Sequence, residues 1–215
     1  FHYGQLDPSH AQAEALNYEA YYELIDVTHD AGTVGYGSPL HRGFFQTGAA
    51  HNTVLIDGVG QAKWNAGTLV GFDATRGMVA ARQDEFRPGV AVERKLEIEG
   101  GKLIETTEAK CTGDAARRIG LVLQIQGKVA VPAGATPSPD IQLPYWKQAR
   151  SWDAGRKVEL TFTAGGREFA LIVESADPLR VTHATTPDSP PATRESLYFE
   201  TTGQSASFKT TWMPR

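Results

Sequence analysis

Apolar and polar residues alternate along most of this chain with a period of two, and this alternation limits the fold more than any other feature. It is clear in RKVELTFTA (156–164) and largely kept in VAVERKLEIE (90–99). Successive side chains of a strand point to opposite faces, so this period predicts strands rather than helices. Turn signals recur roughly every 10 to 15 residues, as in antiparallel sandwiches. The predicted fold class is therefore all-β, an antiparallel β-sandwich of stacked sheets with little helix.

The strand pattern covers a series of short runs separated by turn residues. The predicted strands are 17–27, 52–57, 77–85, 90–99, 102–110, 118–126, 156–164, 167–175, 196–202 and 205–213. Gly-Gly pairs at 100–101 and 165–166 lie where hairpin turns are expected. One short helical turn is predicted from Ser38 to Phe45, with Ser38 as N-cap and Pro39 at the first helical position. The stretches 131–140 and 184–194 are predicted loops.

The composition is that of an ordinary globular domain. The chain has 215 residues, of which 40% are hydrophobic and 21% charged, enough for a large core in one domain spanning residues 1–215. The formal net charge of -4 offers no broad basic field for nucleic acid or an anionic membrane surface. No apolar run reaches the roughly 18 residues of a membrane-spanning helix. We therefore expect neither nucleic acid nor a membrane as a partner.

The cysteine content and the first residue bear on the compartment and on the parent protein. Cys111 is the only cysteine, which excludes an intrachain disulfide. A disulfide-free chain fits the cytosol and a bacterial secreted protein equally well. The chain opens at Phe1 in mid-pattern, without a Met start or a signal peptide. We expect it to be an excised part of a longer protein.

Residues suited to chemistry are concentrated near the N-terminus. Four of the six histidines lie between residues 10 and 51, together with acids, one arginine and a glycine-rich loop at 30–39. His10, Gln12 and Glu14 fall at every second position, which places them on one face of an extended chain. The residues in this window are His10, Asp26, His29, Asp30, His41, Arg42 and His51. Any chemistry is expected within the first 60 residues.

Taken singly, these residues have ordinary structural explanations. A histidine that enters an apolar strand, as His51 does, is most often a hydrogen-bonded core residue. Asp30 could be a turn former that bonds to its own loop. Arg42 could be a surface charge. Trp64, Trp146 and Trp152 could stack on sugars, but core packing is the more common role of tryptophan. Only the order and spacing of the set favour function.

The stretch SHAQAEALNYEAYYELIDVTHDAGTVGYGSPLHRGFFQTGAAHNTVLIDG (9–58) resembles the C-terminal β-domain of the heparinase II/III-like polysaccharide lyases. That superfamily also includes alginate and oligoalginate lyases. The matching motifs are Asp30-x-Gly32 with the following Thr33, then 36–39, His41-Arg42 and 50–54. The resemblance is close over residues 3–61. Beyond them only the rhythm of strands and the loop LPYWK (143–147) agree.

The resemblance implies a division of labour between two domains. In this family the β-domain packs against an N-terminal α-helical toroid, which supplies a catalytic Tyr and His, and the substrate lies in the cleft between them. The first His of the family's His-x-His motif lies near the substrate carboxylate, a role that falls on His10. Further residues expected to act on the substrate are Tyr36 and Arg42 as catalytic groups, and His41, Asn52 and Trp146 as binding groups.

The resemblance also implies a metal site, whose three positions are Gln12, Asp30 and His51. A His-Asp-His set suits zinc, but a neutral amide oxygen is a poor zinc ligand. Three alternatives follow. The site binds zinc weakly, it prefers a harder ion such as calcium or manganese, or it is metal-free and Gln12 hydrogen-bonds Asp30 or His51. Glu14 falls at or next to an acidic position of the family motif.

Uronate lyases act by β-elimination, and this chemistry agrees with the residue types in the window. The substrate carboxylate must be neutralised, a base must take the C5 proton, and an acid must protonate the leaving oxygen. The paired carboxylates of a glycoside hydrolase form no clear motif here. We expect the β-domain of a lyase that cleaves a uronate-containing glycan, with alginate favoured and a glycosaminoglycan next, and incomplete without its helical domain. The alternative is a non-catalytic carbohydrate-binding or structural module. The expected location is periplasmic or secreted, or cytoplasmic for an enzyme that acts on oligosaccharides.

Overall fold

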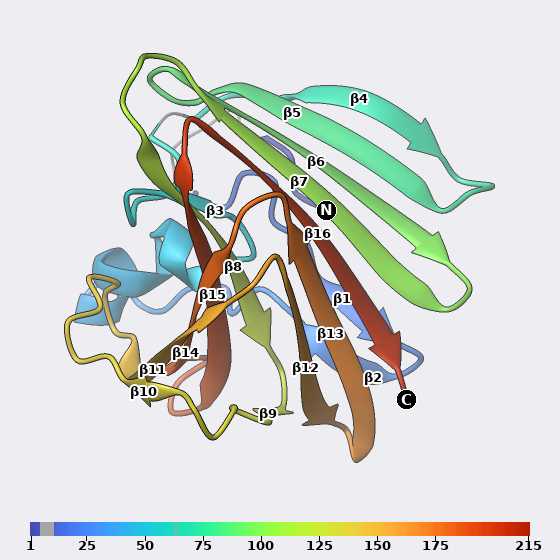
Figure 1. The fold of residues 1–215 in the computed structure, drawn as a ribbon, viewed down its shortest axis with the longest axis vertical. Helices are drawn as coiled ribbons and strands as arrows, with labels where there is room; N and C mark the ends of the chain where they lie inside the picture. The colour runs from blue at the N-terminus through green and yellow to red at the C-terminus, as the bar shows by residue number, and fades with distance from the viewer. Residues whose placement is uncertain (5–10, 63) are drawn as a thin grey trace.

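The computed structural model describes residues 1–4, 11–62 and 64–215, and two antiparallel sheets dominate it (Figure 1). The larger sheet has eight strands in the order β4 (Thr68–Asp73), β5 (Met78–Arg87), β6 (Val90–Glu99), β7 (Lys102–Cys111), β16 (Ser205–Pro214), β13 (Arg167–Ser175), β12 (Lys157–Ala164) and β9 (Lys128–Val129). The smaller has six, in the order β10 (Thr136–Pro137), β11 (Lys147–Ala154), β14 (Leu179–Pro187), β15 (Thr193–Gly203), β8 (Arg117–Ile125) and β3 (Val54–Ile56). The predicted antiparallel sandwich is confirmed.

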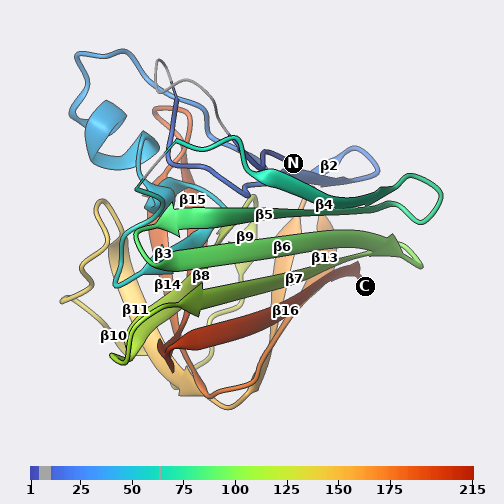
Figure 2. The same cartoon turned by 90° about the horizontal axis from the view of Figure 1, so that it is seen from above.

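Three small elements complete the fold. A hairpin of β1 (Ala20–Tyr22) and β2 (Ile25–Thr28) forms a separate two-stranded sheet. The helical segments are η1 (His41–Phe45), a single π-helical turn, and η2 (Gly48–Ala50), a 3-10 turn. Figure 2 shows the larger sheet on one side of the molecule and the helical segment beside the smaller sheet. No helix among the described residues is long and apolar enough to cross a membrane.

The main core fills the space between the two sheets. Alternate residues of the strands face it, as Val90 and Val92 of β6 do from the larger sheet and Leu121 and Leu123 of β8 do from the smaller one. Burial of these side chains contributes the main stabilisation, at about 25 cal/mol per Å² of apolar surface. The alternation that predicted strands is therefore the pattern of a sheet with one face in the core.

A second apolar cluster lies on the other face of the smaller sheet, and it positions the N-terminal loops. Phe44 and Phe45 of η1 pack there against Val122 of β8 and against Trp146, which lies just before β11. β8 is consequently buried on both faces, from Ile119 to its end. This cluster fixes the chain from η1 to β3 on the outside of the smaller sheet.

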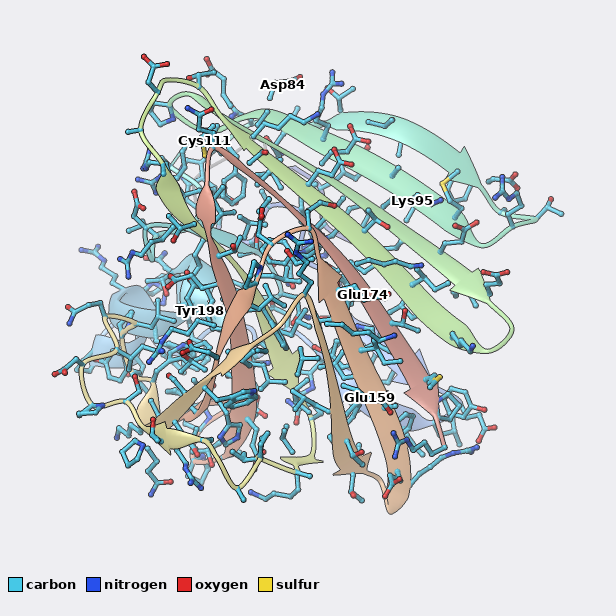
Figure 3. All side chains as sticks on the ribbon, viewed as in Figure 1. Asp84, Lys95, Cys111, Glu159, Glu174 and Tyr198 are labelled. Atoms are coloured by element: carbon cyan, nitrogen blue, oxygen red, sulfur yellow. The ribbon has the colours of Figure 1, made fainter. Side chains whose placement is uncertain are left out.

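Tyr198 of β15 belongs to the same cluster and lies on the side of the smaller sheet where η1 packs (Figure 3). Its ring lies against Gly120 of β8, where an added Cβ would stand 2.2 Å from the ring. Only glycine leaves room for this contact. The glycine in the middle of the buried run RIGLVLQIQ is thus a packing requirement rather than a turn.

The local turn predictions are confirmed. Residues 39–40 are helical and lead into η1, and the backbone N–H of Leu40 donates to the Ser38 hydroxyl at 3.3 Å, as expected of an N-cap serine at residue 38. The four glycines of the two Gly-Gly pairs all have positive φ, between 54° and 79°. That conformation is nearly free of strain only for glycine.

Three sequence predictions were wrong in detail, the first being the loop at 131–140, which contains the short strand β10. The stretch 17–27 is not one strand, because the chain reverses between β1 and β2 at Glu23, whose φ is 55°, and at Leu24, which is fully exposed. The predicted loop at 184–194 is shorter than expected. β14 continues to Pro187 and β15 starts at Thr193, because prolines and threonines at strand ends still pair in the ladder.

Candidate functional site

Three acid and imidazole groups from separate parts of the N-terminal region converge at one place. Glu14 lies before β1, Asp30 is the second residue after β2, and His51 follows η2 shortly before β3. One ligand atom from each of the three lies within 4.8 Å of the others. The His51 side chain is buried, with 1% of its surface exposed, whereas the two carboxylates are partly exposed. We call this set the acid–histidine cluster.

His51 is held by both of its ring nitrogens. Nδ1 lies 2.6 Å from Asp30 Oδ2, and Nε2 lies 2.9 Å from the carbonyl oxygen of Phe45. A carbonyl oxygen can only accept a hydrogen bond, so Nε2 carries a proton. The ring therefore presents Nδ1 to the carboxylates of the cluster.

Asp30 is ionised at neutral pH. Its Oδ2 also accepts from the Asn17 amide at 2.8 Å, and its Oδ1 accepts from the Gly32 backbone N–H at 2.7 Å. Burial raises the pKa of Asp30, but the hydrogen bond and charge of His51, the Gly32 N–H and the charge of Arg194 outweigh burial and bring the pKa to about 2. The Asp-x-Gly motif thus works as a turn in which the glycine N–H binds the aspartate.

Arg194 fixes the relative position of Asp30 and His51 by binding the backbone next to each of them. One terminal nitrogen of its guanidinium donates to the carbonyl of His29 and the other to the carbonyl of Ala50, both at 2.6 Å. These are the residues directly before Asp30 and His51. Arg194 stands near the start of β15 and is only 3% exposed. A planar fork that binds two carbonyls holds both loops in one geometry.

Glu14 and Gln12 approach the cluster from the segment before β1. Burial raises the pKa of Glu14; His51 opposes this effect and Asp30 adds to it. The amide nitrogen of Gln12 donates to the carbonyl of Gly32 at 3.0 Å. Its Oε1 is buried and has no hydrogen-bond partner among the residues that the structure describes. Gln12 thus braces the Asp30 turn, and Glu14 brings the second carboxylate.

Three of the predicted substrate-contacting residues gather around the glycine-rich loop and η1. Tyr36 is 66% exposed and packs edge-on against the ring of His41, with 4.7 Å between the ring centroids. His41 is buried, and its Nδ1 lies 2.9 Å from the Thr33 hydroxyl. Arg42 is exposed beside it. His10, the predicted contact to the substrate carboxylate, lies outside the described residues.

The other two predicted binding residues lie in the interior. Asn52 is 1% exposed; its amide donates to the Tyr18 carbonyl and the Thr28 hydroxyl, both at 2.8 Å. Trp146 is 6% exposed, packs in the second apolar cluster, and its indole N–H points to the Ala49 carbonyl at 3.4 Å. In this structure both residues support the loops of the site and neither faces solvent.

A second charged group next to the site was not anticipated. His29 Nδ1 lies 2.5 Å from Asp26 Oδ2, and its Nε2 lies 3.2 Å from Asp188 Oδ1. The Gln126 amide donates to the other oxygen of Asp188 at 2.9 Å. The hydrogen bond to Asp188, opposed by burial and aided by Asp26, raises the pKa of His29 to about 9. Asp26 and His29 are visible in the sequence window, but Asp188 is 159 residues away from His29, and no local pattern joins them.

A buried ion pair connects the site to the larger sheet. Arg94 of β6 and Glu105 of β7 are both 0% exposed, with 3.0 Å between Arg94 Nη2 and Glu105 Oε1. Arg94 also donates to the carbonyls of Leu16 and Asn52, and the Tyr18 hydroxyl donates to Glu105 at 2.8 Å. The segment before β1 and the start of β3 are thus tied through the core.

These features define a class of protein, a two-sheet β-domain with an acid–histidine cluster on loops outside its smaller sheet. The chain belongs to the Heparinase II/III-like, C-terminal family, whose model matches residues 1–211. Heparan sulfate lyase HepC from Pedobacter heparinus is similar in fold, with a TM-score of 0.70 and 14% identity over 98% of this chain. A heparinase III gene product is similar with a TM-score of 0.66 and 10% identity over 95%.

At these identities the similarity to the two solved structures establishes the fold alone. The chain spans 32% of the length of the first of these proteins and 30% of the second. No curated protein matches the chain in sequence. The family predicted from the motifs is confirmed.

Proposed function

We propose that residues 1–215 form the C-terminal β-domain of a polysaccharide lyase that cleaves a uronate-containing glycan by β-elimination. The observation that carries this proposal is the family match over residues 1–211, within which the acid–histidine cluster is assembled. The rest of the lyase would be an N-terminal α-helical toroid, since the chain covers less than a third of its solved relatives. The expected compartment is the periplasm or the outside of a bacterial cell.

The substrate favoured by the comparisons is a glycosaminoglycan of the heparan sulfate class. The two solved relatives are named as a heparan sulfate lyase and a heparinase III. The preference for alginate, suggested by the sequence motifs, has no support among them. A sulfated uronate polymer needs local cations on a protein whose net charge is -4.

In this proposal the β-domain neutralises the substrate carboxylate. Arg42 is exposed, and Tyr36, which is 66% exposed, packs against the ring of His41. Donors of this kind stabilise the enolate-like charge that develops when the C5 proton leaves. His10 keeps its proposed role at the carboxylate. The base and the acid that complete the elimination would come from the helical domain.

A divalent cation is part of the proposal. Asp30 and His51 have the donor atoms for it, and the His51 Nε2–H bonded to Phe45 gives the orientation usual for a ligating imidazole. The cation would tie the loop after β2 to the segment before β3. Its contribution would be structural, holding the loops that carry Tyr36 and Arg42.

The test uses the full-length protein with heparan sulfate and, separately, alginate. A lyase releases products with an unsaturated uronate end, which absorbs in the ultraviolet. Arg42→Ala is expected to lower kcat/KM on heparan sulfate by about tenfold to a hundredfold, with little change in stability, because the side chain is exposed. Binding of either glycan without release of the unsaturated product would support the non-catalytic module instead. Cleavage that yields only saturated ends would exclude β-elimination.

A further inference from the structure

The metal site implied by the family resemblance and the site built in this chain do not use the same ligands. The implied set consists of Gln12, Asp30 and His51. In the structure the amide nitrogen of Gln12 is committed to the Gly32 carbonyl, and a neutral amide oxygen adds no charge to a metal site. The carboxylate of Glu14 instead lies with the donor atoms of Asp30 and His51.

We propose that Glu14 is the third ligand of a divalent-cation site with Asp30 and His51, and that this replacement makes the site rich in oxygen donors. The inference deepens the proposed function and rests on it only for the expectation that a cation is present. It assigns Glu14 a role that the motif spacing left open.

The convergence of the three groups is the first argument. Two carboxylates and one imidazole have ligand atoms within 4.8 Å of one another, although Glu14 and His51 lie 37 positions apart in the sequence. Two carboxylates so close repel each other unless they share a proton or a cation lies beside them. In the structure Glu14 shares a hydrogen bond with Asp30, and its Oε2 lies 3.3 Å from Nδ1 of His2. A divalent cation would take the place of the shared proton and be bound by both carboxylates.

The state of His51 is the second argument. Its Nε2 is bound to the Phe45 carbonyl at 2.9 Å, so the nitrogen that faces the carboxylates is Nδ1. The 2.6 Å from Nδ1 to Asp30 Oδ2 is a hydrogen-bond distance, in which a proton joins the two atoms. A cation that takes the place of this proton finds an imidazole already fixed in orientation, with its far N–H satisfied.

The third argument is the side-chain oxygen of Gln12, which has no hydrogen-bond partner among the described residues. The side chain is 9% exposed, and its Oε1 is buried without a hydrogen bond among the described residues. A buried amide oxygen in this state costs free energy, of the order of 1–3 kcal/mol. It lies two residues before Glu14 and on a side chain anchored to the Asp30–Gly32 turn. This oxygen can accept a hydrogen bond from a water bound to the cation.

The donor set determines which cation fits. Carboxylate oxygens favour calcium and manganese, whereas a second imidazole favours zinc. Zinc generally binds a mixed nitrogen–oxygen site more tightly than manganese does, so absolute affinities do not reveal the preference. The informative quantity is the ratio of zinc to manganese affinity, and how it changes when one ligand is exchanged.

The experiment uses the full-length protein stripped of metal with a chelator. Calorimetric titration with manganese, calcium and zinc is expected to show one site per chain, and bound manganese is expected to give a distinct electron paramagnetic resonance signal. Glu14→Gln, which keeps the size of the side chain, should weaken manganese binding at least tenfold. Glu174→Gln is the matched control; Glu174 lies on β13 of the larger sheet (Figure 3), where it pairs with Lys157 at 3.6 Å, and its substitution should leave binding unchanged.

A second variant, Gln12→His, distinguishes the proposed ligand set, in which Glu14 is the third ligand, from the set implied by the family resemblance, in which residue 12 is. It supplies a second imidazole, so the ratio of zinc to manganese affinity should rise at least tenfold. A circular dichroism spectrum and melting temperature close to wild type confirm that each variant is folded. The inference is overturned if no ion binds stoichiometrically, if Glu14→Gln binds manganese as wild type does, or if Gln12→His leaves the ratio unchanged.

These outcomes are distinguishable from failure of the proposed function. Lyase activity in protein that binds no ion would leave the function standing and remove the cation site. Stoichiometric binding that depends on Glu14, in a protein that never yields an unsaturated product, would keep the site and remove the lyase.

Discussion

His51 and His29 lie in neighbouring loops and each pairs with an aspartate, but their second ring nitrogens face different groups. The second nitrogen of His51 faces the carbonyl of Phe45, whereas that of His29 faces another carboxylate, Asp188. His51 is buried, and the His29 side chain is 24% exposed. The comparison shows how the partner of the second ring nitrogen decides whether an imidazole is held as a cation or can bind a metal.

An imidazole between two carboxylates is held as a cation. His29 has this environment, its pKa is raised to about 9, and neither nitrogen is left to ligate a metal. His51 has one carboxylate and one carbonyl, so it can give Nδ1 to a cation and still keep its other hydrogen bond. The His29 group and the acid–histidine cluster are adjacent, because His29 directly precedes Asp30 in the chain. Arg194 connects them by hydrogen bonds to the carbonyls of His29 and Ala50.

The largest effect is expected from Arg194→Lys, which breaks the connection between the two groups. An ammonium cannot bind both the His29 and Ala50 carbonyls in the geometry of the fork. The free energy of unfolding should fall by about 2–4 kcal/mol, because a buried carbonyl loses its donor and the charge is left poorly paired. Urea denaturation measures this. Arg150→Lys, which affects one bond to the Ala135 carbonyl at 2.6 Å, should cost less than about 1.5 kcal/mol.

Asp30→Asn and Asp188→Asn form a matched pair that separates the two histidines. Each removes one carboxylate from an imidazole and should lower the free energy of unfolding by about 1–3 kcal/mol. Only Asp30→Asn should weaken manganese binding, by at least tenfold, because only His51 belongs to the proposed cation site. Equal loss of binding in both variants would mean that the two groups act as one site.

The general architecture could be predicted from the sequence because the two faces of a strand appear locally as alternating apolar and polar residues. The runs 90–99 and 167–175 coincide with β6 and β13. β14 and β11 were missed, since LRVTHATTP and KQARSWDA have few apolar residues and their partners lie elsewhere in the chain. Pairing over long sequence separations leaves no local signal.

The site was predictable only where it follows a motif. Asp30 and His51 were found because Asp-x-Gly and Ala-His-Asn have fixed spacing, and the structure brings them together. Glu14 was noted without a role, because its position beside the two depends on how the segment before β1 folds back. Arg194 and Asp188 come from a stretch that reads as a proline-rich loop, and only the tertiary fold places them behind the site.

The third prediction concerns pH. The folded pKa of His29, about 9, lies above the unfolded value near 6.5, so its contribution to stability is complete below pH 6.5 and is lost as the pH rises to 9. Allowing for solvent screening of a partly exposed group, the loss should be about 1–2 kcal/mol. Urea denaturation at pH 6 and pH 9.5 measures it. His29→Gln should remove this difference, and a pH dependence that survives the substitution would show that other groups cause it.

The smallest effect is expected from Gln126→Met, which tests whether charge or hydrogen bonding holds His29. The substitution removes the amide that donates to Asp188 at 2.9 Å and also lies 3.2 Å from His29 Nε2. Loss of one neutral donor should cost about 0.5–1.5 kcal/mol. The raised pKa of His29 should persist in NMR titration, because Asp26 and Asp188 both remain. A return of that pKa towards 6.5 would mean that Gln126 aligns Asp188 for the bond, and that the contrast with His51 depends on geometry as much as on charge.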